Sequence, residues 1–505
     1  MNAPAATWDY LILTASNDRQ ASAYESQLQA RREAGRLGRA RETLVVADLE
    51  GKRIGSGGST VECLRAVVAR EARAGESDEQ TLSRLRILII HAGGDSRRLP
   101  AYGPCGKIFL PVPGESDGEL GRTLFDLLAP AFMELPAGAA GQGQVVVTAG
   151  DALIRIDMSA VRLDRPGITG VGSWAEPEEA ARHGVYCAGE DGRVRLYLQK
   201  PSISEQEKAG AINGAGRTIL DAGVMSFDGA AAAALMRAFP GREMMLERGI
   251  DIYREVCCAL GEEGTLKHYV RSAQGSGSEW TEEELRAAYP ALSGIPFWAE
   301  VSPRCEFLHF GSTRQLIESG MELSGGERLL VMNSVVEAEI EGEESWVEGC
   351  RIGAAVKLGG RNVLVGVDVE KPLALPRGAS IDVLSGEGGW FIRCYGVEDD
   401  FKTKAEKGGK FCGRPLLEWI ELVGGRPEDF WCGGEARSLW SARVFPAEAR
   451  PEFAKWLWMF EPGAASDEQK RGYLAAKRRS AEEIAWLSDQ DAFHARRREL
   501  NRRKG

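Results

Sequence analysis

The sequence lacks the cysteine and histidine spacings that are typical of zinc-binding or disulfide-bonded folds. Its ten cysteines contain no C-x-x-C pair, and two of them, Cys257 and Cys258, are adjacent. Its five histidines form no H-E-x-x-H or similar motif. Such spacings are what zinc sites and disulfide frameworks require. We therefore expect reduced thiols and no histidine-based metal site.

Long apolar runs and large blocks of one charge are also missing. The first residues, "MNAPAATWDYLILTASND", have no cationic start, and no apolar stretch in the chain is long enough to cross a bilayer. The 63 basic and 74 acidic side chains give a net charge of −11, with no long single-sign block before the C-terminus. Nucleic-acid binding draws on many cationic phosphate contacts, so this balance argues against it. We expect a soluble, cytoplasmic protein with neither membrane nor nucleic acid as partner.

What the first 300 residues do contain is an alternation of strand-like and helix-like segments. The apolar runs are "DYLILTAS", "TLVVADL", "RILIIHAGG", "QVVVTAGD" and "TILDAGVMSF". Between them lie helical patterns such as "RQASAYESQLQARREAGR" and "GIDIYREVCCALG". This order predicts an α/β fold with a mainly parallel sheet, whose ligands bind beyond the carboxyl ends of the strands.

The texture changes after residue 320. Between about 320 and 385, apolar residues recur roughly every sixth position, as in "IGAAVKLGG", which favours a parallel β-helix-like domain; a β-sandwich is the alternative. From about 400 the chain is rich in Trp and Pro and then in charge, with a helix expected to begin at a cap of Ser480 and Glu483. The closing "HARRRELNRRKG" is interpreted as a solvated helix end. We therefore expect domains at 1–310, 311–400 and 401–505.

The stretch "IIHAGGDSRRLPAYGPCGKIFLPVP" predicts an anion-binding loop. A buried strand ends at Gly93 and Gly94, which allow backbone conformations that side chains forbid and can expose amide hydrogens. Ser96, Arg97 and Arg98 then add hydroxyl and guanidinium donors, and the planar fork of Arg matches phosphate oxygens. An ordinary βα turn with solvated arginines is the alternative.

A second glycine loop, "GSGGST", runs directly into the helical "VECLRAVVAR". Gly55, Gly57, Gly58 and Ser59 could hold a phosphate or a base edge at the helix N-terminus, and a helix cap without ligand is the alternative. No Gly-Lys-Ser/Thr follows, so the loop is not a P-loop. Neither loop has the dinucleotide spacing G-x-G-x-x-G.

Two charged residues stand at further strand ends. Asp151 follows the strand "VVVTAG", where a carboxylate could hold Mg²⁺ together with phosphate oxygens or, alternatively, cap a helix. Lys200 ends a predicted hairpin in "HGVYCAGEDGRVRLYLQKPS". Because Pro201 disfavours helical backbone before it, we expect an extended Lys200 aimed at a sugar phosphate; a surface lysine is the alternative.

Taken together, these motifs resemble those of the L-fucose-1-phosphate guanylyltransferase family. The similar stretches are "WDYLILTASN", "RIGSGGST", "HAGGDSRRLPAYGPCGKIFLPVP", "TAGD", "HGVYCAGEDGRVRLYLQKPS", "LDAGVMSF", "FLHFGST" and "FCGRPLLEWIELVG". The resemblance implies a Rossmann-like nucleotidyltransferase sheet, a β-helix-like domain and a C-terminal helical segment. It also implies transfer of a guanylyl group from GTP to a sugar 1-phosphate, with Mg²⁺ (or Mn²⁺) as cofactor.

The resemblance further implies a role for each candidate residue. Arg98 and Lys107 are the implied catalytic cations. The implied nucleotide contacts are Gly55, Gly57, Gly58, Ser59, Gly93, Gly94, Ser96, Arg98 and Lys107. The sugar phosphate would meet Gly184, Lys200 and Gly223, and the metal would be held by Asp151 and by Asp251 in "GIDIY". Asp95, beside the expected triphosphate, departs from the broader pyrophosphorylase pattern.

Alternative functions are weighed on the same residues. A β-helix acyltransferase would need a histidine base in the repeat region, and none lies between His309 and His494. A sugar kinase would need a Gly-Leu-Gly-Ser-Ser type loop, which is not found. A non-catalytic nucleotide-sugar-binding homologue and a pyrophosphorylase for another sugar 1-phosphate both remain open.

Overall fold

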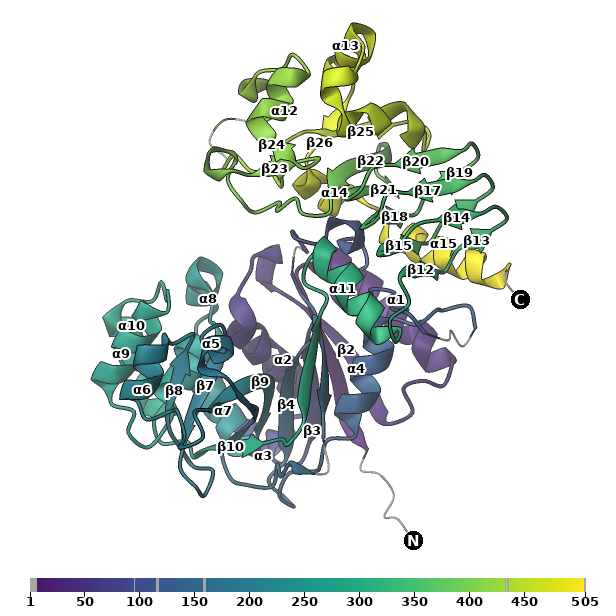
Figure 1. Ribbon diagram of the computed structural model, residues 1–505. Helices are drawn as coiled ribbons and strands as arrows, with labels where there is room; N and C mark the ends of the chain where they lie inside the picture. Colours follow the sequence, from purple (N-terminus) through teal and green to yellow (C-terminus); the bar gives the residue numbers. More distant parts are fainter. Residues whose placement is uncertain are drawn as a thin grey trace. The chain divides into compact units, whose positions relative to one another are not determined.

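The computed structural model describes residues 7–94, 96–114, 118–157, 160–431, 433 and 436–503 (Figure 1). The chain forms two compact units. Unit 1 comprises Met1–Gly94 and Leu127–Phe307, and unit 2 comprises Asp95–Asp126 and Leu308–Gly505. The division falls inside the first glycine loop, so residues 95–126 group with the C-terminal part of the chain. The sequence boundaries had placed them with the N-terminal domain.

Unit 1 is built on a mixed sheet with nine strands among its described residues. The main strand order is β10-β6-β9-β4-β3-β1-β2, and β7 pairs with β8 and β9. The strands are β1 (Trp8–Ala15), β2 (Ala40–Ala47), β3 (Arg86–His91), β4 (Gln144–Ala149), β6 (Ile168–Ala175), β7 (Gly184–Ala188), β8 (Val194–Gln199), β9 (Thr218–Phe227) and β10 (Phe297–Val301). The α/β class and the five predicted strand runs are confirmed. The expectation of a mainly parallel sheet is corrected, because β9 runs antiparallel to both β4 and β6.

Helices cover this sheet. They are α1 (Asp18–Glu33), α2 (Gly55–Glu71), α3 (Asp78–Leu82), α5 (Pro177–Ala180), α6 (Ile203–Lys208), α7 (Gly229–Ala238), α8 (Arg242–Arg248), α9 (Leu266–Gly275) and α10 (Glu282–Leu292). Helix α4 (Leu124–Met133) leads the chain back into unit 1, and β5 (Ala152–Ile156) pairs with β11 (Cys305–His309). The predicted helix in "GIDIYREVCCALG" is a π-helical turn, Ile252–Val256, followed by a 3-10 turn, Cys257–Ala259.

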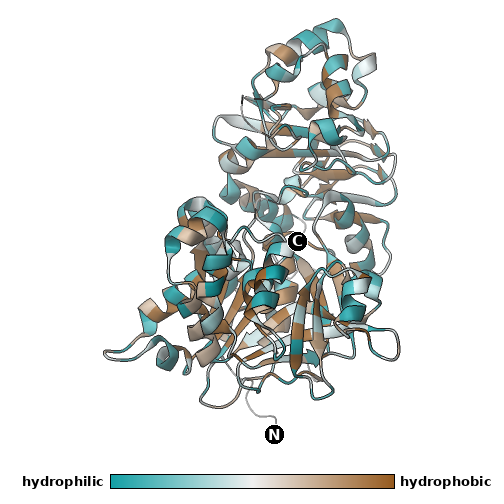
Figure 2. Cartoon of the chain, turned by 90° about the vertical axis from the view of Figure 1, so that its left-hand side faces the viewer, coloured by the Kyte–Doolittle hydropathy of each residue, from teal (hydrophilic) through white to brown (hydrophobic). Residues whose placement is uncertain are grey.

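The hydrophobic core of unit 1 follows from the two-residue period of the strands. One apolar cluster joins alternate strand residues, such as Ile12, Ile89 and Val147, to side chains of α2 and α7. The residues between them in sequence, including Leu11, Leu13, Leu88 and Ile90, are buried as well. Since neighbouring strand residues point to opposite faces, both faces of the sheet are covered. Figure 2 shows these strands as largely hydrophobic ribbons.

Unit 2 contains three short parallel ladders. Their strands are β12 (Leu329–Met332), β15 (Ser345–Glu348), β18 (Val363–Val365) and β21 (Ala379–Gly386) in the first, β13 (Val335–Val336), β16 (Arg351–Ile352) and β19 (Asp368–Val369) in the second, and β14 (Ile340–Glu341), β17 (Val356–Leu358) and β20 (Leu373–Leu375) in the third. Leu330 pairs with Trp346, Trp346 with Val363, and Val363 with Ser380. In each of these pairs the partner lies 16 or 17 residues further along the chain. The strands pair in parallel, whereas those of a β-sandwich pair antiparallel.

The remainder of unit 2 is antiparallel and helical. Strands β22 (Gly389–Gly396), β25 (Phe445–Glu448) and β26 (Arg478–Arg479) extend the first ladder, and β23 (Lys410–Phe411) pairs with β24 (Arg414–Pro415). The helices are α11 (Thr313–Leu323), α12 (Leu416–Leu422), α13 (Asp467–Ala475), α14 (Ala481–Leu487) and α15 (Gln490–Arg502). The predicted cap of Ser480 and Glu483 is confirmed as a capping box on α14. The prediction that "HARRRELNRRKG" is a solvated helix end is wrong, because Arg497 of α15 is buried and ion-paired.

Among the described residues, no helix combines the length and apolar character needed to cross a membrane.

Candidate functional site

The carboxyl ends of three parallel strands meet at one edge of the sheet in unit 1. Strand β1 pairs in parallel with β3, and β3 with β4. The amides of Ala92 and Gly93, just after β3, donate to Thr14 Oγ1 at 3.0 and 3.3 Å. On the other side, the Gly150 amide donates to the His91 carbonyl at 2.9 Å. The predicted glycine loop therefore leaves the sheet from a backbone that is held on both sides.

Gly93 and Gly94 are required there for different reasons. A Cβ atom on Gly93 would lie 3.2 Å from the carbonyl carbon of Ala15, which is tighter than ordinary contact. Gly94 has a φ of 138°, a conformation that residues with a side chain rarely adopt. Both glycines are exposed, so this part of the loop is accessible to a ligand. Asp95, which follows, lies outside the described residues.

Two polar pairs that the sequence did not single out connect this edge to the start of α2. Thr60 Oγ1 lies 3.0 Å from His91 Nε2, and Ser59 Oγ lies 2.6 Å from Asp48 Oδ1. The Asp48 amide donates to the Ala15 carbonyl at the end of β1. Burial lowers the pKa of His91 to about 4, so its imidazole is neutral at pH 7. Asp48 follows the strand-like run "TLVVA" and His91 follows "RILII", and these positions at strand ends are the sequence feature that could have identified the two residues.

The glycines at the start of α2 serve packing. The amides of Gly57 and Gly58 donate to the carbonyl oxygen of Ile250 at 2.7 and 3.2 Å, and the Ile250 amide donates to the carbonyl of Ile54. A Cβ on Gly55, whose φ is 76°, would overlap the Ile250 carbonyl. These amides are thus already paired within unit 1. A nucleotide contact by Gly55, Gly57, Gly58 or Ser59 stays a prediction.

The two proposed metal ligands lie within electrostatic reach of one tyrosine. Burial raises the pKa of Tyr253 well above its usual value, and the negative charges of Asp221, Asp251 and Asp151 raise it further. Asp151 is exposed and sits between β4 and β5, so it caps no helix. Asp251 Oδ1 accepts from the amides of Tyr253 and Arg254 at 3.0 and 3.1 Å. One oxygen of Asp251 is therefore engaged in capping.

No group of three or more Asp, Glu, His or Cys side chains suited to a metal ion occurs in the described ranges. A dedicated protein cage for a cation is thus not found in that part of the chain. Mg²⁺ usually takes only one or two carboxylates and completes its coordination with phosphate oxygens and water, so a metal-binding role for Asp151 and Asp251 stays a prediction.

The predicted hairpin packs against a buried carboxyl group of β9, which lies beside two of the candidate glycines. Strands β7 and β8 pair as expected, with the turn closed between Gly189 and Gly192. Asp221 accepts hydrogen bonds from the Tyr197 hydroxyl (2.8 Å) and the Gly223 amide (2.7 Å). A Cβ on Gly184 would overlap the Tyr197 hydroxyl. Gly184 and Gly223 are therefore brought together around Asp221.

Lys200 differs from the expected conformation. Its φ is 50°, in the left-handed region, so the prediction of an extended Lys200 before Pro201 is wrong. The Lys200 amide donates to the His183 carbonyl at 2.9 Å, which ties the end of β8 to the residue before β7. This turn leaves Lys200 exposed at the end of the hairpin. A left-handed conformation at a residue other than glycine costs about 1 kcal/mol or more and is frequent at functional positions.

The cationic half of the first loop belongs to unit 2. Ser96 is buried with a φ of 51°, and the Arg98 carbonyl accepts from the Thr313 amide at 2.9 Å. The two adjacent arginines separate: Arg97 stacks on the Trp440 ring at 5.4 Å, whereas Arg98 is exposed. Lys107, half-buried, begins a 3-10 turn after Gly106. Among the described residues, no carboxylate lies within ion-pairing distance of the Arg98 guanidinium.

A family model described as the fucose pyrophosphorylase domain matches residues 79–450. The chain belongs to this family. The match includes the candidate residues from Gly93 to Asp251. The glycine loop at α2 and the helix α15 lie outside the matched residues, so the family match gives no information about the role of either.

Curated relatives agree with the family. An L-fucokinase/L-fucose-1-P guanylyltransferase from Bacteroides fragilis is 27% identical over 91% of this chain and 48% of its own length. A bifunctional fucokinase/GDP-fucose pyrophosphorylase from Arabidopsis thaliana is 27% identical over 95% and 50%. A fucose-1-phosphate guanylyltransferase from Homo sapiens is 24% identical over 87% and 81%. The chain spans about half the length of the first two relatives and most of the third.

We predict that Gly55→Ala destabilises the protein by about 2–4 kcal/mol, because the added methyl group overlaps the Ile250 carbonyl at a positive φ. Gly75→Ala is the matched control: Gly75 has a φ of 80° but no atom within 4 Å of its Cβ position, so we expect a loss of only about 1 kcal/mol. Urea denaturation measures both values. Equal losses would contradict the packing role of Gly55.

A second prediction concerns Asp221, whose pKa burial raises from 3.8 to about 6. Between these values the folded protein holds a proton that the unfolded chain has released, so stability falls as pH rises from 4 to 6. The effect is at most about 3 kcal/mol. Asp221→Asn should flatten this part of the profile. The unfolding free energy, measured by urea denaturation every half pH unit from 4 to 7, gives the comparison.

Burial also raises the pKa of Asp399 in unit 2 to about 6. The contribution of Asp399 to the pH dependence of the unfolding free energy should therefore persist in the Asp221→Asn variant. Parallel profiles for wild type and variant would show that Asp221 ionises normally in the folded protein.

Proposed function

We propose that this protein is a nucleotidyltransferase that condenses a sugar 1-phosphate, L-fucose 1-phosphate in the first instance, with GTP. The products are a GDP-sugar and pyrophosphate. The observation that carries the proposal is the fucose pyrophosphorylase domain over residues 79–450, which includes the cationic loop with Arg98 and Lys107. The names of the three relatives, each a fucose-1-phosphate guanylyltransferase or a GDP-fucose pyrophosphorylase, support the same reaction.

The reaction follows from the charges of the substrates. A phosphate oxygen of the sugar 1-phosphate attacks the α-phosphorus of GTP, a new P–O bond forms, and the bond from the α-phosphorus to the bridging oxygen of pyrophosphate breaks. The nucleophile is already an anion, so no general base and no covalent enzyme intermediate are needed. What the protein must supply is neutralisation of several negative charges at contact distance.

In this proposal the cations divide the work. Arg98 and Lys107 act on the triphosphate, with Gly93, Gly94 and Ser96 as contacts along the loop. Lys200, at the end of β8, meets the phosphate of the sugar. Gly184 and Gly223, which lie beside Asp221, are the other proposed contacts to the sugar phosphate. Ser96 and Lys200 both have a positive φ, a strained conformation that clusters at functional sites, which supports these assignments.

Mg²⁺ (or Mn²⁺) is the proposed cofactor, and Asp151 and Asp251 would hold it. Bound there, it would offset phosphate charge. The common influence of both carboxylates on Tyr253 supports the pairing. Of the two, Asp151 has the more accessible carboxylate, whereas one oxygen of Asp251 accepts two backbone amides.

We also infer the finer fold assignments. The parallel strands β1–β4 with flanking helices are the Rossmann-like core of a nucleotidyltransferase sheet. The three parallel ladders of unit 2, repeating every 16 or 17 residues, are the coils of a parallel β-helix.

The decisive experiment is a matrix of GTP, ATP, UTP and CTP against a panel of sugar 1-phosphates, followed by pyrophosphate release. We expect the fastest turnover with GTP and L-fucose 1-phosphate. Lys107→Ala should lower that turnover at least about 100-fold while leaving the fold intact, because it removes charge that stabilises the transition state. Absence of pyrophosphate with every pair would favour the non-catalytic nucleotide-sugar-binding alternative.

Activity should depend on a divalent cation. Excess chelator should abolish pyrophosphate release, and added Mg²⁺ or Mn²⁺ should restore it. Asp151→Asn should lower activity by about two orders of magnitude, because the amide keeps the shape of the side chain but loses the charge that attracts a hard cation. Full activity of the chelated wild type would remove the metal from the proposal.

A further inference from the structure

Several groups along the loop that bears Arg98 and Lys107 bind other parts of unit 2. The backbone carbonyl of Arg98 accepts from the Thr313 amide, at the start of α11. Gly311 lies beside the Arg98 guanidinium, since a Cβ built on it would be in ordinary contact with Arg98 Nη2 at 3.8 Å. Two buried arginines support the next residues of the loop, Arg393 by a direct hydrogen bond and Arg497 through Glu348.

The first anchor is Arg393 on β22. Its side chain is 2% exposed, and its Nη2 donates to the Pro100 carbonyl at 2.7 Å. Its Nε donates to Asp382 Oδ1 on β21, also at 2.7 Å, and the Asp382 side chain is fully buried. The carboxylate balances the arginine charge, so the guanidinium can remain buried while it holds a loop carbonyl.

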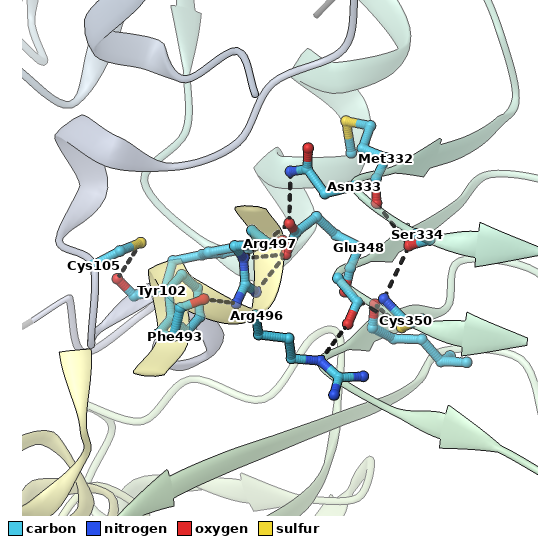
Figure 3. Close-up of polar contacts among 12 residues, drawn as sticks. Tyr102, Cys105, Met332, Asn333, Ser334, Glu348, Cys350, Phe493, Arg496 and Arg497 are labelled. Atoms are coloured by element: carbon cyan, nitrogen blue, oxygen red, sulfur yellow. Dashed lines mark hydrogen bonds and ion pairs between the residues drawn. The ribbon is translucent and has the colours of Figure 1, made fainter. Parts of the chain in front are cut away.

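The second anchor is built around Tyr102 (Figure 3). The Tyr102 hydroxyl accepts from Trp346 Nε1 at 2.6 Å and donates to Glu348 Oε2 at 3.3 Å. Arg497 of α15 pairs with both oxygens of Glu348, through Nε at 2.9 Å and Nη2 at 2.6 Å. Phe493 of the same helix meets the Tyr102 ring edge to face at a centroid distance of 6.2 Å.

Helix α15 also holds the other end of the inserted segment. Asn501 Nδ2 donates to the Glu119 carbonyl at 3.2 Å, and Arg502 forms an ion pair with the Glu119 side chain at 2.8 Å. One C-terminal helix therefore contacts residues on both sides of Lys107. These contacts join positions that are more than 380 residues apart in sequence.

Stability alone is a weak reason for such pairs. Replacing a buried ion pair by apolar side chains of similar volume is often neutral or even stabilising, because desolvation offsets the attraction. A directional network, by contrast, fixes one geometry of the groups that it binds. Here the bound groups are the Pro100 carbonyl and the Tyr102 hydroxyl, which lie between Arg98 and Lys107 in the chain.

We propose that the pairs Arg393–Asp382 and Arg497–Glu348, acting through Pro100 and Tyr102, are positioning devices that hold Arg98 and Lys107 in the geometry needed for nucleotidyl transfer. The inference rests on the proposed function. It assigns a role in catalysis to unit 2 and to α15, which lies outside the residues that the family model matches.

Tyr102→Phe tests the second anchor with the smallest change, because the ring and its packing remain. The matched control is Tyr473→Phe: Tyr473 is also fully buried in unit 2, but its hydroxyl donates to the Val444 carbonyl at 2.9 Å, away from the loop. We expect kcat to fall at least tenfold in Tyr102→Phe and to stay within twofold of wild type in Tyr473→Phe. The two melting temperatures should be similar.

The double variant Arg393→Met/Asp382→Leu tests the first anchor and removes both charges together. Its fold should survive for the reason given above, whereas the Pro100 carbonyl loses its donor. We expect a fall in kcat of similar size. If Tyr102→Phe does not fold, this variant carries the test alone.

Hydrogen exchange of the amides between Leu99 and Leu110 supplies a readout that does not depend on activity. It should accelerate at least fivefold in both loop-anchor variants of the full-length protein and not in Tyr473→Phe. Unchanged exchange would overturn the anchoring itself. Accelerated exchange with unchanged kcat would overturn the role in catalysis. If the variants show accelerated exchange but the wild type releases no pyrophosphate, the anchoring is supported and the proposed function is refuted.

Discussion

A loop whose cations must meet anionic substrates has to be fixed through groups other than those cations. The segment from Ser96 to Leu110 has several such attachments in unit 2. Its backbone carbonyls at Arg98 and Pro100 and the hydroxyl of Tyr102 provide the attachment points. Even the adjacent Arg97 is used in this way, since it stacks on Trp440 while Arg98 is exposed. The donors to these three groups are the Thr313 amide, the buried Arg393 guanidinium and Trp346 Nε1, respectively. Arg393 and Arg497 are each paired with a buried carboxylate.

The sheet edge in unit 1 follows a related principle. Its polar side chains bind the protein's own backbone and one another: Thr14 accepts from the loop amides, Ser59 lies on Asp48, and Thr60 lies on His91. Because Gly57 and Gly58 donate to Ile250, the first amides of α2 are already used inside the fold. For the proposed phosphate contact, the exposed Gly93 and Gly94 are therefore better candidates than the start of the helix.

Local patterns predicted local structure well. The β-branched runs gave β1, β3 and β4, and the Ser480/Glu483 spacing gave a helix start, because such features depend on neighbours in sequence. Strand direction was beyond reach: "TILDAGVMSF" reads the same whether β9 runs parallel or antiparallel. The insertion of residues 95–126 into unit 2 was also not predictable, since it depends on partners such as Trp346 and Arg393.

Charge runs were the least informative pattern. The segment "HARRRELNRRKG" has the composition of a solvated helix, yet Arg497 within it is buried against Glu348, 149 residues away. Only the tertiary structure brings a carboxylate to that arginine. For the candidate site, the sequence predicted Asp151 and Lys200 from their places at strand ends and Gly223 only through the family resemblance, and all three roles stay predictions. It missed Asp48, His91 and Asp221, whose importance lies in what they bond.

Backbone strain offers an argument for function that is independent of family membership. Ser96, Lys200 and Asn333 all have φ near 50°, where glycine would avoid the cost of a side chain. Asn333 shows why a side chain is retained in such a place, because its amide donates to Glu348 Oε1 at 2.8 Å and so completes the cluster under Tyr102. Lys200 has the same backbone conformation at an exposed position. An exposed loop position gains little from packing, and in the function proposed above the charge of Lys200 is used to bind the sugar phosphate.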